Sequence, residues 1–270
     1  MKFALCNEMF EGMTMAQVCS IAGRLGYHGI EIAPFTLGES AETISAGLRK
    51  ETRRIISDSG LETVGLHWLF AGPKGLHITT QDNKIWGRTR DYLSCLLDLC
   101  KDLDGKVLVL GSPKQRNIQP GQTYEEARKR ACDLLVSVLD KAQELGLTIC
   151  IEPLSPVETD FINTVTQGIE IVRQINHPNL KIHLDIKAMS SETTPVPDII
   201  RSVKVEDIGH FHVNDPNLYG PGMGKVDYAP IAKAIHYIGW DKWLSVEVFK
   251  YDPDPETIAR KSIEYLQLYF

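Results

Sequence analysis

The chain has 270 residues, of which 43% are hydrophobic and 24% are charged, the usual balance of a globular protein. Its formal net charge of −6 argues against a nucleic-acid or anionic-membrane partner, because proteins that neutralise phosphates are normally basic. No apolar run reaches the ~18 residues of a membrane-spanning helix, and the N-terminus lacks a signal-peptide core, so we expect a cytoplasmic address. The six cysteines lack CxxC spacing and are interpreted as buried, reduced thiols.

Strand-like and helix-like segments alternate from end to end. In chain order the strand-like segments are FALC, GIEIA, TVGLHW, KVLVLG, LTICIE, LKIHLD, GHFHV and WLSVEV. Apolar periodicity predicts helices over 14–25, 44–59, 123–145, 165–175, 198–202, 228–238 and 256–268, and one more before KVLVLG. A glycine that fits a helix C-cap stands before several strands, at Gly26, Gly60, Gly146 and Gly239.

Eight such units in a chain of this length predict the α/β class, as a single (β/α)8 TIM barrel that forms one domain over residues 1–270. The alternative is a doubly wound open sheet. No dinucleotide-binding glycine pattern follows the first strand, which disfavours that alternative.

Four acidic or imidazole residues stand at the C-terminal ends of four consecutive predicted strands. They are Glu152, Asp185, His212 and Glu247, separated by 33, 27 and 35 residues. Barrel active sites are built at this end, and three converging carboxylates would repel one another unless a divalent cation held them. We therefore predict one metal ion bound by these four residues. Hard oxygen ligands with one imidazole favour Mn²⁺, with Mg²⁺ or Co²⁺ as alternatives.

Alternation along the strands predicts what lies beneath this site. It places Cys150, His183, His210 and Ser245 one layer deeper in the barrel, with His210 as a candidate to support His212. Glu31, at the end of the second strand, is a weaker site candidate, and its alternative is to pair with a basic side chain inside the barrel.

Other polar residues near the predicted mouth are candidates for substrate binding. His67 and Trp68 end the third strand, a pair that suits a polyol, although a core histidine is nearly as good an interpretation. Glu158 lies in the loop after Glu152, and an exposed loop acid is its alternative. Lys187 shares the strand parity of Asp185 and could donate to a substrate. Arg116 belongs to the basic segment KQR after the fourth strand, which could hold a phosphate or carboxylate or be solvated.

At these residues the chain resembles the xylose-isomerase-like TIM barrel superfamily, in particular its sugar phosphate isomerase/epimerase group with the ketose 3-epimerases. The resemblance runs from GYHGIEIAPF through GLHWLF and IEPLSPVETDFINT to HLDIKAM, HVNDPNLYGPGMG and SVEVF. It implies that Glu152 and Glu247 are both metal ligands and the acid–base pair, and that Glu158 assists there.

The chain departs from the epimerase pattern where substrate is held. Ala188 stands where a histidine is usual, Leu218 and Tyr219 where an arginine is usual, and 155–156 is Ser-Pro in place of an asparagine–arginine pair. A site built to hydrogen-bond a substrate hydroxyl discriminates strongly between substrates, so the loss of these side-chain donors should change which substrate is preferred. We therefore expect poor activity on free fructose, tagatose or psicose and better activity on an oxidised, cyclic or modified sugar.

The resulting hypothesis is an enzyme of carbohydrate metabolism, a metal-dependent isomerase or epimerase that moves a proton next to a carbonyl through an enediolate. A lyase acting on an oxidised (keto) sugar or glycoside is the alternative. A phosphodiester hydrolase resembling endonuclease IV is disfavoured by the net charge, and a non-catalytic sugar-binding protein by the intact quartet. The expected partner is a small-molecule carbohydrate. The sequence does not decide the oligomeric state, and a homo-oligomer stays open.

Overall fold

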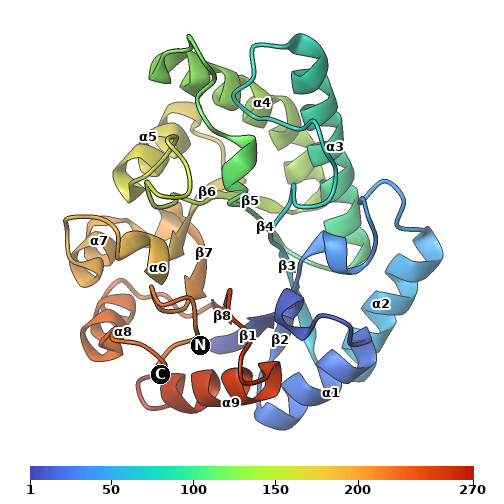
Figure 1. Ribbon diagram of the computed structural model, residues 1–270, viewed down its shortest axis with the longest axis vertical. Coiled ribbons are helices and arrows are strands. Elements are labelled where there is room, and N and C mark those ends of the chain that lie inside the picture. Colours follow the sequence, from blue (N-terminus) through green and yellow to red (C-terminus); the bar gives the residue numbers. More distant parts are fainter.

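The computed structural model describes residues 1–270, and its eight parallel strands close into a barrel in chain order (Figure 1). Each strand pairs with its sequence neighbour, and β8 pairs with β1 to complete the ring. The strands are β1 (Lys2–Cys6), β2 (Gly29–Ile32), β3 (Glu62–Leu66), β4 (Val107–Leu110), β5 (Thr148–Ile151), β6 (Leu180–Asp185), β7 (Ile208–Val213) and β8 (Trp243–Val246). The predicted (β/α)8 barrel is confirmed.

The helices surround the barrel, as Figure 1 shows. They are α1 (Met15–Leu25), α2 (Ala46–Asp58), α3 (Asn83–Asp102), α4 (Tyr124–Leu145), α5 (Val165–Ile175), α6 (Ile186–Met189), α7 (Val196–Ser202), α8 (Tyr228–Tyr237) and α9 (Pro255–Leu266). The short helix α6, directly after β6, was not expected. None of the nine combines the length and hydropathy that a membrane-spanning helix requires.

The helix ends follow from local sequence. Thr14, Thr123 and Thr164 each form a capping box with the Gln or Glu three residues later, which satisfies backbone N–H groups of the first turn. At the other end, Gly26 and Gly146 take positive φ angles of 89° and 69° at the helix C-caps, as expected of glycine there.

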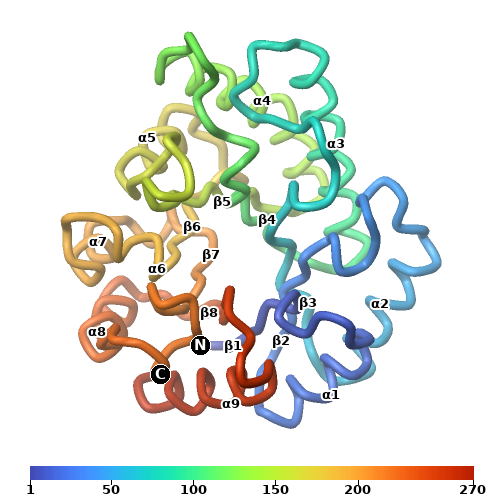
Figure 2. The backbone as a smooth tube through the Cα atoms, viewed as in Figure 1, coloured from blue at the N-terminus to red at the C-terminus, as the bar shows by residue number.

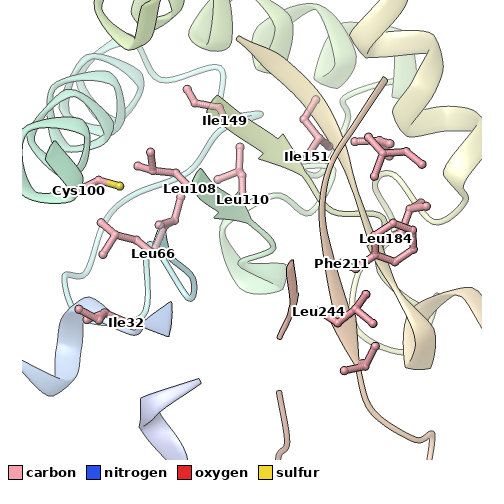
Figure 3. Packing of buried hydrophobic residues seen from close by; sticks show 14 of the residues in the cluster. Ile32, Leu66, Cys100, Leu108, Leu110, Ile149, Ile151, Leu184, Phe211 and Leu244 are labelled. Carbon is pink, nitrogen blue, oxygen red and sulfur yellow. The ribbon is translucent and has the colours of Figure 1, made fainter. Parts of the chain in front are cut away.

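Each strand sends alternate side chains into the barrel and toward the helices. The outward set forms the apolar core between strands and helices, and it includes Ile149, Ile151, Leu184, Phe211 and Leu244 (Figure 3). The alternation therefore turns the intervening residues of β5 to β8 into the barrel. This is why polar groups can lie buried at the C-terminal ends of these strands.

The two ends of the chain meet on one side of the barrel. Figure 2 shows β1 beside β8, and the rings of Phe3 and Phe270 lie 6.3 Å apart between centroids. This packing joins the last helix to the first strand.

Candidate metal centre and active site

Acidic and imidazole side chains from β5, β6 and β7 converge inside the C-terminal end of the barrel. Ligand-type atoms of Glu152, His183, Asp185 and His212 all lie within 4.8 Å of one another, and all four side chains are buried. Glu247, just after β8, joins this group because its Oε2 lies 3.0 Å from Nδ1 of His212. The structure thus brings together the four residues predicted as ligands, with His183 as an additional neighbour.

The backbone and Asn214 fix the Asp185 carboxylate. Its Oδ1 accepts from the N–H of Ala188 (2.6 Å), where Asp185 is the N-cap of α6, and its Oδ2 accepts from Nδ2 of Asn214 (2.6 Å). Asn214 also accepts from the N–H of Lys187 at 2.8 Å. A carboxylate has about four lone-pair sites, so two donors leave room for a cation.

Glu31 determines how His212 presents its ring. Nε2 of His212 lies 3.0 Å from Oε1 of Glu31, and Nε2 of His210 lies 2.7 Å from Oε2 of the same carboxylate. Burial alone would raise the pKa of Glu31, but the two histidines hold it well below its usual range. The ionised carboxylate therefore takes the Nε2–H bond of His212, which leaves Nδ1, toward Glu247, as the atom that could bind a cation. The alternative interpretation of Glu31, a pairing with basic side chains inside the barrel, is confirmed.

A tryptophan after β3 holds Glu247 from the other side. Nε1 of Trp68 donates to Oε1 of Glu247 at 2.8 Å, and the Trp68 ring stacks on Phe249 at 6.0 Å between centroids. Trp68 has a φ of 50°, a left-handed conformation that bulky residues rarely adopt. Such strain is found mainly at functional sites.

The carboxylates of the cluster titrate in opposite directions. Burial raises the pKa of Glu152 well above its usual range, and the negative charges of Glu247 and Asp185 raise it further. Burial would also raise the pKa of Glu247, but the adjoining His212 imidazole lowers it to about 2. Burial lowers the pKa of His212, whereas Glu31 and Glu247 raise it well above its usual range. Without a cation, the raised pKa values of Glu152 and His212 favour the protonated form of both groups.

The donor set fits a divalent metal ion. Three carboxylates and one imidazole are hard or borderline ligands, and a cation would replace the protons that Glu152 and His212 hold. His183 adds a buried ring whose two nitrogens have no hydrogen-bond partner and whose Nε2 lies 3.9 Å from Oε1 of Glu152. Residues of this chain can thus hold the ion that the strand-end pattern predicts.

A cavity of about 750 Å³ opens directly above this cluster. Glu152 and Glu247 line it, as do four of the five residues predicted to bind substrate: His67, Trp68, Glu158 and Lys187. Nζ of Lys187 donates to Oε1 of Glu158 at 2.7 Å and lies 4.5 Å from the centre of the Phe249 ring. The two charged residues therefore form one pair at the wall of the cavity.

His67 has a second set of contacts besides its place at the cavity. Its Nε2 lies 2.7 Å from Oε2 of Glu8, and both side chains are buried. Glu8 and Glu247 both come within 4.8 Å of His67 with their ligand-type atoms. His67 thus combines the two interpretations of its sequence position, a satisfied buried histidine and a residue at the edge of the site.

Arg116 does not line the cavity. Its side chain is 1% exposed, and its guanidinium donates to the backbone carbonyls of Glu152 (2.7 Å) and Leu110 (2.5 Å). It therefore ties the ends of β4 and β5 together, which corrects the expectation that it binds substrate. Its neighbours Lys114 and Gln115 do line the cavity.

Three residues of the site were not recognised from the sequence. They are Glu8, Asn214 and, as a neighbour of the proposed ligands, His183. Asn214 lies two residues after His212, so the alternation of β7 carries a signal for it. His183 was placed one layer deeper, although its ring centroid lies 4.2 Å from that of His212. Glu8 follows β1 in a short 3-10 helix and has no such signal.

Comparisons with known proteins show the family and the fold of the chain. The chain is 24% identical over 241 residues to an L-ribulose 3-epimerase of Mesorhizobium japonicum, covering 89% of this chain and 78% of that protein. It is 26% identical over 230 residues to a D-psicose 3-epimerase of Agrobacterium fabrum, covering 84% and 76%. The crystal structure of a D-psicose 3-epimerase determined with D-fructose superposes with a TM-score of 0.88 at 21% identity, over 100% of this chain and 99% of that one. The family model of the xylose isomerase-like TIM barrels matches residues 19–269, and the chain therefore belongs to this family.

Proposed function

We propose that this protein is an enzyme, a divalent-metal-dependent sugar epimerase or isomerase that moves a proton on the carbon next to a carbonyl. The observation that carries this proposal is the pair of carboxylates that faces the cavity, Glu152 and Glu247, whose pKa values shift in opposite directions. A pair of titratable groups in contrasting environments is the usual sign of an acid and a base that work together.

Each glutamate has a role that follows from its contacts. Glu247 accepts from Nε1 of Trp68 and faces His212, so it stays ionised and is held in one orientation, as a base requires. The carboxylate of Glu152 forms no hydrogen bond within the protein, with Nε2 of His183 3.9 Å away, and burial raises its pKa so that it retains a proton readily. One glutamate removes the substrate proton to give an enediolate, and the other returns a proton to the opposite face or to the neighbouring carbon.

The four strand-end residues Glu152, Asp185, His212 and Glu247 would hold the cation, for which we propose Mn²⁺, with Mg²⁺ or Co²⁺ as alternatives. When bound, the cation would polarise the substrate carbonyl and acidify the adjacent C–H bond. Glu31 orients His212 by accepting from its Nε2, and Asn214 orients Asp185 by donating to its Oδ2.

The relatives favour epimerisation over elimination or hydrolysis. Both curated relatives named above are 3-epimerases of ketoses. The substrate is not settled by this likeness. Ala188 lies directly beside Asp185 and offers only a methyl group, and Leu218 lies outside the cavity lining. We therefore retain the expectation that free ketohexoses are poor substrates and that a modified sugar is preferred.

Deuterium incorporation from solvent tests the proposal directly. The Mn²⁺-loaded protein is incubated in D₂O with a panel of ketoses and keto-sugars, and exchange at the carbon next to the carbonyl is followed by NMR. We expect exchange that requires the metal and is lost in Glu152→Gln and Glu247→Gln but persists in Glu62→Gln, a matched change at the exposed start of β3. Absence of exchange across the panel by metal-loaded protein would refute the proposed reaction.

A further inference from the structure

The charged residues that line the cavity come from different loops. All its acidic lining residues, Glu152, Glu158 and Glu247, follow β5 or β8. The loops after β3 and β4 instead contribute Lys74 and Lys114 and no acid. A protein with a net charge of −6 thus presents a positive wall to its own cavity.

These two lysines are not used by the protein itself. Lys187, the third lysine at the cavity, is paired with Glu158. Lys74 and Lys114 are exposed and form neither an ion pair nor a side-chain hydrogen bond. Positive charge is reinforced nearby, since a Cβ built on Gly75 would lie 3.5 Å from a guanidinium nitrogen of Arg88. An anion beside Lys74 and Lys114 would therefore meet two ammonium groups that are not paired with a carboxylate of the protein.

The loops that carry the lysines form one connected wall. The N–H of Phe70 donates to Oγ of Ser112 (3.1 Å), and the N–H of Ile78 donates to the carbonyl of Gln115 (2.8 Å). Gly72 packs so closely on the segment before α2 that an added Cβ would lie 2.3 Å from the carbonyl oxygen of Glu39. These contacts fix the backbone from which both lysine side chains extend.

The size of the cavity leaves room for more than a free ketose. Its volume of about 750 Å³ lies in the upper half of the ~300–1,000 Å³ range of pockets for drug-sized ligands, which are larger than one hexose. If a sugar places its carbonyl at Glu152 and Glu247, the space beside Lys74 and Lys114 can hold a substituent on the remainder of the molecule.

We propose, resting on the proposed function, that the substrate carries an anionic group on the part distant from the reacting carbon, and that Lys74 and Lys114 bind this group. A carboxylate and a phosphate share the required chemistry, since both are acceptors for lysine ammonium groups. Steering by the two free charges also draws an anionic substrate into the cavity.

The test compares the binding of one neutral and two anionic ketoses. Dissociation constants of D-fructose, D-fructuronate and D-fructose 6-phosphate are measured calorimetrically on the Mn²⁺-loaded protein, and solvent exchange is followed in parallel. We expect at least one anionic ketose to bind about fivefold or more tightly than D-fructose, the scale of two exposed ion pairs. Which of the two binds better distinguishes a carboxylate from a phosphate. The preference should shrink at ~0.5 M NaCl, because salt screens exposed charges.

The lysines are tested by a double variant with a matched control. Lys74→Ala/Lys114→Ala should abolish the preference for the anionic ketose, whereas Lys50→Ala/Lys84→Ala, on exposed faces of α2 and α3, should keep it. Equal affinity for neutral and anionic ketoses in the wild-type protein, or an unchanged preference in the first variant, overturns the inference. Preferential binding of an anionic ketose without solvent exchange would support the anion site and refute the proposed proton transfer. Solvent exchange without such a preference would support the proton transfer and refute the anion site.

Discussion

Replacing Glu31 with glutamine should weaken metal binding although Glu31 is not itself a proposed ligand. Its Oε1 lies 3.0 Å from Nε2 of His212, so it fixes the ring with Nδ1 toward the cavity and makes the imidazole a better donor. The amide of the introduced glutamine has nearly the same shape as the carboxylate and keeps an acceptor oxygen. The change therefore removes the charge and leaves an acceptor for only one of the two histidines that Glu31 contacts.

The expected loss can be estimated from the contact distance. Two unit charges about 4 Å apart contribute ~4 kcal/mol at an effective dielectric constant of 20. A neutral imidazole ligand carries only part of a charge at Nε2, so we expect a loss of ~1.4–2.7 kcal/mol, which is ~10–100-fold in the dissociation constant of Mn²⁺. The constant is measured by isothermal titration calorimetry, with Glu62→Gln as the control and circular dichroism as the check on folding.

The pH dependence of this loss separates it from structural damage. In the metal-free protein Glu31 and Glu247 raise the pKa of His212, so a proton competes with the metal for Nδ1. Removing the charge of Glu31 weakens that competition, and the defect should therefore be largest at about pH 8 and smaller near pH 6. A folded variant whose Mn²⁺ affinity at pH 8 lies within about twofold of the wild type would refute the role of Glu31.

Further predictions concern the ligands themselves. Asp185→Asn and His212→Ala should lose most bound metal by elemental analysis while the fold persists; full metal content in both would misplace the site. Glu152→Gln and Glu247→Gln should each lower turnover roughly 10²–10⁴-fold, and near-wild-type exchange by either would exclude that residue as acid or base. Mn²⁺ binding should release protons, seen as calorimetric heats that depend on the buffer, because metal displaces protons held by Glu152 and His212. Metal-free Glu152→Gln should melt at a higher temperature than metal-free wild type at pH 8. The pKa of Glu152 is raised in the folded state, so the wild type loses stability as the pH rises above the pKa that this carboxyl has in the unfolded chain. The glutamine side chain does not titrate, so the variant does not lose this stability. An equal or lower melting temperature would contradict this.

Much of the fold could be predicted because it depends on local patterns. Apolar alternation located the strands, and apolar periodicity together with C-cap glycines located helix ends such as those of α1 and α4 to within one residue. The same alternation gave the inward direction of Glu152, Asp185, His212 and Glu247, because strand parity fixes the direction of a side chain without knowledge of its contacts.

Loop residues were harder, because nothing periodic fixes their direction. Arg116 looked like a cation at the mouth, yet its guanidinium turns inward to two backbone carbonyls, which a loop sequence does not specify. Glu8 was overlooked for the same reason, since its approach to His67 depends on how the turn after β1 folds back. Strand parity thus gave the inward residues within the barrel, whereas it could not place Arg116 and Glu8, whose directions are set by loops.

The arrangement at the end of the barrel is better explained by function than by stability. Burying Glu152 and Asp185 beside Glu247 costs free energy, because like charges and desolvation both oppose ionisation there. The fold nevertheless makes space for this cluster: a Cβ at Gly111 would lie 1.6 Å from Oε2 of Glu152, so a larger residue there would displace that carboxylate from its place. Outward side chains of the same strands, such as Ile151 and Leu184, pack in an ordinary apolar core. The cost is therefore confined to one end of the barrel, where a cation and a substrate would offset it.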